Sequence, residues 1–117
     1  MKSKDAVAAL SALSHEGRLG IFRALVKAGP DGLAAGEIAR KQGVAPNTLS
    51  AQLLVLANAR LVHARRDGRS IIYAADFAAM SGLLLFLTED CCGGNAEICA
   101  PLAQTVNQCC PPKRASR

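Results

Sequence analysis

The side chains best suited to chemistry in this 117-residue sequence are five cysteines, which all lie after residue 90. They form two adjacent pairs with a single cysteine between them, namely Cys91, Cys92, Cys99, Cys109 and Cys110. Adjacent cysteines form only a strained disulfide with each other, but they can present two thiolates to one ion. The Gly93-Gly94 pair lets the chain fold back, so that Cys99 can supply a third sulfur. The pattern predicts a thiolate site for a soft ion.

The number of sulfur ligands decides which ion would fit such a site. Three thiolates suit trivalent arsenic or antimony, whereas four suit zinc or cadmium. Between residues 90 and 110 histidine is absent and only Asp90 and Glu97 offer carboxylates, which excludes calcium and magnesium. The predicted ligands of As(III) or Sb(III) are Cys91, Cys92 and Cys99, with Cys109 and Cys110 as further candidates. Thiol redox sensing, through a disulfide such as one between Cys92 and Cys109, is the alternative use of the same residues.

The rest of the chain is basic and aliphatic. Its formal net charge of +5 and pI of about 9.2 favour a polyanionic partner, nucleic acid before an acidic membrane surface. No signal-peptide pattern opens the sequence, and the longest apolar run, residues 83–87, is too short to span a membrane. We therefore expect a cytoplasmic protein with no membrane partner, a setting in which structural disulfides are rare.

Hydrophobic periodicity and turn residues predict five helices and one hairpin. The helices are expected over residues 4–13, 15–27, 35–42, 46–59 and 77–88, with Ser14 and Asp76 as the N-caps of the second and fifth. Strands are expected over 61–66 and 69–74, joined by a type I′ turn at Asp67-Gly68. Two short helices joined by a turn that contains Gly43, followed by a hairpin, are typical of a winged helix-turn-helix. The predicted fold class is therefore mainly α with a β-hairpin wing.

The apolar positions indicate how these elements pack. Leu49, Leu53 and Leu56 should form the buried stripe of the fourth helix, and Leu19 and Phe22 should lie on the buried side of the second. The fifth helix is apolar almost all round, so one side should pack on a second subunit. We expect a DNA-binding and dimerisation domain over residues 1–90 and a Cys-rich inducer-binding tail over 91–117.

The second helix of a helix-turn-helix enters the major groove of double-stranded DNA with its first residues at the base edges. The predicted contacts from this helix are Asn47, Thr48, Ser50, Ala51 and Gln52. The wing would add phosphate or minor-groove contacts through Arg65, Arg66 and Arg69. His15 and His63 lack ligand-like neighbours and are expected to be structural. We find no combination of residues that indicates an enzyme or a catalytic cofactor.

Over about residues 4–90 the sequence resembles the ArsR/SmtB family of metal-responsive repressors. The matching stretches are residues 9–19, 33–39 and 47–53, together with Leu56, residues 66–69 and Tyr73. The resemblance implies a homodimer joined through the first and last helices. It also implies repression of an arsenic-resistance operon, relieved when the inducer binds.

The sequence departs from the family pattern at three places. Residues 34–38 lack the Cys-Val-Cys arsenic site of many members, and Asp76 lacks the His partners of the zinc-sensing members. Gln52 stands where His is usual, which leaves the base preference open. A subgroup of arsenic repressors instead carries a Cys-Cys pair and a further Cys just past the last helix, and Cys91, Cys92 and Cys99 are similar to that arrangement. The sequence thus predicts an arsenite- or antimonite-responsive repressor. Its alternatives are a redox sensor and a repressor that responds to cadmium, zinc or methylarsenite.

Overall fold

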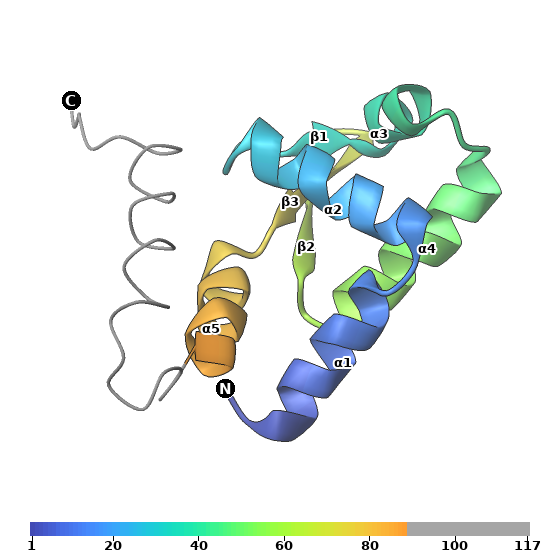
Figure 1. The fold of residues 1–117 in the computed structure, drawn as a ribbon. Coiled ribbons are helices and arrows are strands. Elements are labelled where there is room, and N and C mark those ends of the chain that lie inside the picture. Colours follow the sequence, from blue (N-terminus) through green and yellow to red (C-terminus); the bar gives the residue numbers. More distant parts are fainter. Residues whose placement is uncertain (89–117) are drawn as a thin grey trace. The chain divides into compact units, whose positions relative to one another are not determined.

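The computed structural model describes residues 1–88, which form five helices and three short strands (Figure 1). In chain order they are α1 (Ser3–Leu13), α2 (Glu16–Ala28), β1 (Leu33–Ala34), α3 (Ala35–Gln42), α4 (Pro46–Asn58), β2 (Val62–Asp67), β3 (Ser70–Ala75) and α5 (Phe77–Thr88). This confirms the predicted winged helix-turn-helix, with α3 and α4 as the helix pair and β2–β3 as the wing. Met1–Leu83 form one compact unit, and the end of α5 belongs to the unit that begins at Leu84.

Aliphatic side chains from α2 and α4 form the centre of the core. Leu49, Leu53 and Leu56 of α4 are buried, as predicted. In α2 the buried residues are Ile21, Phe22 and Leu25, whereas Leu19 is 41% exposed. Placing Leu19 on the buried side was therefore wrong. Its neighbour Ile21, which is wholly buried, points into the core instead.

Helix α1 packs through its alanines rather than through its large side chains. Ala6, Ala9 and Ala12 are buried against the rest of the unit, which lets α1 approach α2 and α4 closely. Val7 and Leu10, by contrast, are 65% and 43% exposed. The large apolar side chains of α1 are therefore available at the surface.

The N-cap of α2 lies one residue later than predicted. Nδ1 of His15 accepts hydrogen bonds from the backbone N–H groups of Gly17 (3.1 Å) and Arg18 (3.4 Å). Ser14 instead donates from its hydroxyl to the carbonyl of Ser11 at the end of α1 (2.6 Å). The imidazole thus takes the place of the usual Ser, Thr, Asp or Asn oxygen at this cap.

The sheet has three antiparallel strands in the order β1-β3-β2. The two-residue β1, which the sequence pattern does not predict, pairs Leu33 with Tyr73 and Ala34 with Ile72. It is too short to show a period of two. The preceding Gly32 has φ +71°, and a side chain there would collide with the carbonyl of Tyr73. The close approach of this loop to β3 therefore requires glycine.

The turn of the wing also differs from the prediction by one residue. Asp67 pairs with Ser70, so the two-residue loop consists of Gly68 and Arg69. Only the first of these has a positive φ, +64° at Gly68, which is the pattern of a type II′ turn rather than type I′. The error moves each strand by one position and places Arg69 at the tip of the hairpin.

Helix α5 begins as predicted, because Oδ1 of Asp76 accepts a hydrogen bond from the N–H of Ala79 (3.0 Å). Leu83 is buried, whereas Leu84, Leu85 and Leu87 are 53%, 70% and 52% exposed. Apolar side chains are therefore exposed along this helix, the last one in the described part of the chain. None of the helices described in residues 1–88 is long and apolar enough to cross a membrane.

Candidate nucleic-acid interface

Helix α4 presents an uncharged polar surface at its N-terminal end. Gly43, in the left-handed conformation with φ +65°, ends α3, and Pro46 occupies the first turn of α4. Because the leucine stripe faces inward, the predicted base contacts Asn47, Thr48, Ser50 and Ala51 are all exposed. The helix contains no charged residue at all. Among the groups that can recognise bases, this helix therefore offers amide, hydroxyl and methyl groups.

Gln52 does not share this outward orientation. It is only partly exposed, and its Oε1 is buried without a hydrogen-bond partner within the described part of the chain. Its Nε2 lies against the start of α2, where a methyl group on Gly17 would be only 2.6 Å away. The structure thus separates Gln52 from the other four residues predicted to contact DNA.

The three wing arginines are exposed, but their surroundings differ. Nη2 of Arg65 donates a hydrogen bond to the carbonyl of Asp31 (3.1 Å), which ties the wing to the loop before β1. Arg66, the next residue of β2, projects from the opposite face of the hairpin, since side chains alternate along a strand. Arg69 lies in the two-residue loop at the tip. Arg66 and Arg69 are therefore the wing side chains with the greatest freedom to reach a phosphate.

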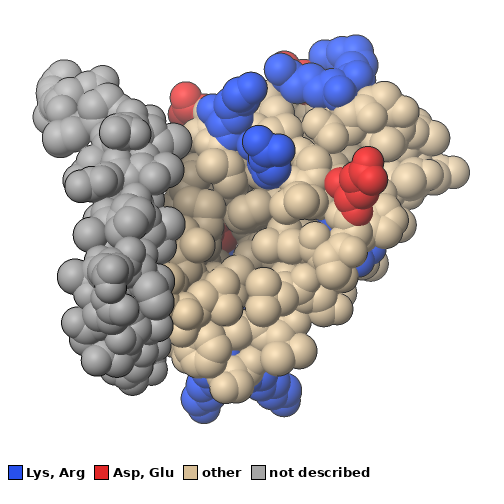
Figure 2. Space-filling view, viewed as in Figure 1, with Lys and Arg blue, Asp and Glu red and all other residues tan. Residues whose placement is uncertain are grey.

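All of the chain's net positive charge falls within residues 1–88. These contain 11 Lys and Arg and six Asp and Glu, which gives +5, the value for the full sequence. Besides the wing arginines, Arg40 and Lys41 supply basic side chains in the last turn of α3. Figure 2 shows basic groups in the upper part and at the bottom of one face, with a mainly uncharged area between them that also carries an acidic group. The uncharged helix α4 thus follows a basic end of α3 in the chain, and basic groups of this kind suit contacts with phosphates.

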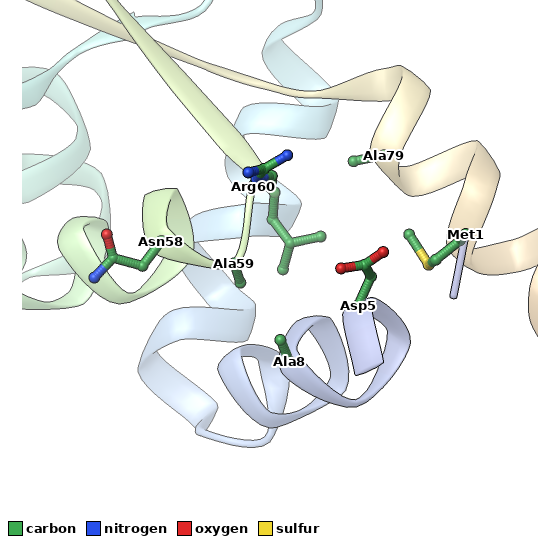
Figure 3. Close-up of a pocket in the computed structure, with 8 residues that line it drawn as sticks. Met1, Asp5, Ala8, Asn58, Ala59, Arg60 and Ala79 are labelled. Carbon is green, nitrogen blue, oxygen red and sulfur yellow. The ribbon is translucent and has the colours of Figure 1, made fainter. Parts of the chain in front are cut away.

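A pocket of about 200 Å³ lies where α4 leads into the wing (Figure 3). It is lined by Met1, Asp5, Ala8, Asn58, Ala59, Arg60, Leu61 and Ala79. Arg60 has a positive φ of 65°, and the N–H of Leu61 donates to the carbonyl of Leu56 (3.0 Å). Arg60 thus occupies the left-handed position that ends a helix, which glycine usually takes. The pocket lies at the end of α4 remote from the predicted base contacts.

The structure describes none of the predicted thiolate ligands. Cys91, Cys92, Cys99, Cys109 and Cys110 all lie outside residues 1–88, as does the predicted tail 91–117. Within the described residues, no group of three or more His, Cys, Asp or Glu side chains could hold a metal ion.

Comparison with known proteins identifies the class of regulator. A family described as a helix-turn-helix domain matches residues 13–65. An ArsR-like transcriptional regulator from Rhodococcus sp. RHA1 is 26% identical, with a TM-score of 0.67 over 92% of this chain and 93% of that one. NolR from Sinorhizobium fredii is 32% identical, with a TM-score of 0.59 over 73% and 83% of the two chains. The chain belongs to the ArsR/SmtB family of transcriptional regulators. Proteins of this family bind DNA and are not enzymes.

A further solved structure supports the fold alone. It is the homodimeric winged helix-turn-helix domain of Mb0332 from Mycobacterium bovis, described as a possible ArsR-family transcriptional regulator. It is 22% identical, with a TM-score of 0.61 over 97% of this chain and 88% of that one. The comparison with curated proteins gave no match.

Proposed function

We propose that this ArsR-family regulator is a cytoplasmic repressor that binds its operator as a homodimer and releases it when arsenite or antimonite binds Cys91, Cys92 and Cys99. One observation carries the proposal. All five cysteines lie within residues 91–110, just beyond the end of α5 at Thr88, and residues 1–88 contain none. The DNA-reading elements and the soft-ion donors are therefore separate parts of one chain.

The exposed apolar side chains of α1 and α5 support the homodimer. Val7 and Leu10 on α1 and Leu84, Leu85 and Leu87 on α5 are each more than two-fifths exposed. Burial of such side chains at about 25 cal/mol per Å² would favour association of two copies. Two copies of α4 would then read a two-fold symmetric operator.

The donor set fits As(III), because three thiolates match the preference of this soft ion for sulfur. When bound, the ion draws three sulfur atoms from one short segment together. That segment follows α5 directly, so its rearrangement acts on the helix that supplies part of the proposed dimer surface. A hundredfold loss of operator affinity requires about 2.7 kcal/mol of coupling between the two sites.

Operator release measured in parallel with arsenite, antimonite, zinc, cadmium and peroxide tests the proposal. Arsenite and antimonite should release the wild-type chain from its own upstream DNA. The variants Cys91→Ser and Cys92→Ser should stay bound while retaining wild-type affinity without inducer. If both variants release normally with arsenite, the proposed site is wrong. Release by peroxide alone would replace it with a redox switch, and release by zinc or cadmium alone with a different metal sensor.

A serine series over the remaining cysteines assigns their roles. Cys99→Ser should abolish the arsenite response as Cys91→Ser does, because a third thiolate is then missing. Cys109→Ser and Cys110→Ser should retain the response. A loss with either of these two and none with Cys99→Ser would move the third ligand to the second cysteine pair.

A further inference from the structure

Two glycines of α2 each face the end of a glutamine side chain, one from α3 and one from α4. Gly17 and Gly20 are three residues apart and so lie on the same face of α2. A methyl group on Gly17 would lie 2.6 Å from Nε2 of Gln52 in α4. A methyl group on Gly20 would lie 2.7 Å from Oε1 of Gln42, the last residue of α3. Side-chain carbons essentially never come this close to other atoms, so an alanine would displace either glutamine.

Helix α2 is anchored firmly, so contacts with it can affect where α3 and α4 lie. Its residues Ile21, Phe22 and Leu25 are buried in the core. Nε of Arg18 also donates a hydrogen bond to the carbonyl of Ala12 (2.6 Å), which ties α2 to α1. The two glycine positions are therefore fixed relative to the core. Buried side chains also hold α3 and α4, through Ile38 and the leucine stripe, and the two glutamines add a second contact with α2 nearer the DNA-facing end.

The environment of Gln52 supports a role in packing. Its Oε1 is buried and accepts no hydrogen bond from any residue in 1–88, so this oxygen is turned away from solvent without a polar partner there. A side chain turned toward Gly17 is not directed at a base edge. The exposed residues Asn47, Thr48 and Ala51 remain available for that contact.

We infer that Gly17 and Gly20 adjust the position of α3 and α4 through Gln42 and Gln52, and that Gln52 is a positioning residue rather than a base-reading one. The inference rests on operator binding but not on the inducer. Hydrogen bonds to base edges require the reading helix at a defined depth in the groove, because they weaken steeply with distance and angle. Displacing Gln52 therefore reduces specific binding more than binding to unrelated DNA.

A double-mutant cycle between Gly17→Ala and Gln52→Ala tests this by operator affinity without inducer. Gly17→Ala should weaken operator binding about threefold or more, as is typical of contacting residues. When Gly17→Ala is added to Gln52→Ala, operator affinity should fall almost no further. The thermal midpoint of Gly17→Ala should be unchanged or higher, because alanine is the better helix former. Gly20→Ala with Gln42→Ala provides an independent second cycle, and Gly36→Ala is the control, since its nearest neighbour would be 3.8 Å away.

The cycle also separates the contact with Gln52 from that with His15. A methyl group on Gly17 would lie 3.2 Å from Cε1 of His15, and this tight contact persists when Gln52 is truncated. The inference would be overturned if the losses of operator affinity in the two single variants simply add in the double variant. It would also be overturned if Gly17→Ala has wild-type operator affinity. Neither result would contradict operator binding itself.

Base preference supplies a readout that does not depend on the folding of the glycine variants. Operators with one base pair changed at a time should all be weakened by the same factor in Gln52→Ala, so that the profile of preferred bases is unchanged. If Gln52→Ala instead loses discrimination at one base pair only, Gln52 reads that base and the inference is wrong.

Discussion

Substitution of Arg69 at the tip of the wing should change how operator affinity depends on salt. Arg69 lies in the two-residue loop of the hairpin and is exposed. If each wing tip neutralises one phosphate, Arg69→Ala removes two such interactions from a dimer. The slope of log affinity against log salt concentration falls by about 0.9 for each phosphate that is no longer neutralised, or about 1.8 for the dimer. Between 50 and 200 mM salt, the affinity advantage of the wild type over the variant then shrinks about twelvefold.

Fluorescence anisotropy of a labelled operator duplex over this salt range measures the slope directly. Arg23→Ala is the matched control, because Arg23 is an exposed arginine in the middle of α2, outside the helix-turn-helix and the wing. Arg65→Ala should change the slope less than Arg69→Ala, since the Arg65 guanidinium already donates to the carbonyl of Asp31. Equal slopes for Arg69→Ala, Arg23→Ala and the wild type would refute the assignment of the wing to the DNA backbone.

Four further predictions concern stability, measured by urea unfolding at one fixed protein concentration because dimerisation contributes. Arg60→Gly should raise the free energy of unfolding by about 1 kcal/mol, since Arg60 holds a positive φ that glycine adopts without strain, and a decrease would contradict this reasoning. Asp76→Ala should lower it by about 1 kcal/mol through loss of the α5 cap, with Asp76→Asn close to wild type. Leu53→Ala should cost about 2–5 kcal/mol, and a smaller loss would show that the site collapses around the missing atoms. Gly32→Ala should cost about 2 kcal/mol or more, and a neutral result would mean that the loop can move away from β3.

The helices could be predicted from the sequence because local chemistry fixes them. Gly43 and Pro46 mark the turn between α3 and α4, and the spacing of Leu49, Leu53 and Leu56 defines a buried stripe. Asp76 similarly marks the start of α5. Each of these signals acts within a few residues, so it can be interpreted without knowledge of the tertiary structure.

The features that sequence reasoning missed depend on neighbours distant in the chain. Strand β1 exists because Gly32 lets the loop approach Tyr73 about forty residues later, and two residues carry no period of their own. The inward orientation of Gln52 depends on the empty space above Gly17. The pair of glycines three residues apart in α2 was a visible signal, because glycine in the middle of a helix is costly unless something packs against it.

The wing shows how a small local ambiguity changes a site. Asp67-Gly68 and Gly68-Arg69 are both acceptable two-residue loops, since either contains the glycine that a positive φ requires. The pairing of Asp67 with Ser70 selects the second. That choice places Arg69 rather than Asp67 in the loop, and so puts a cation at the tip of the wing.

Operator affinity of the full-length chain with and without arsenite tests the central claim most directly. Anisotropy titrations on its own upstream DNA, at one salt concentration under reducing conditions, give both affinities. We predict that saturating arsenite weakens binding by about a hundredfold, equivalent to about 2.7 kcal/mol, and that Cys91→Ser removes this effect. Equal operator affinity of the wild-type chain with and without arsenite would contradict the account.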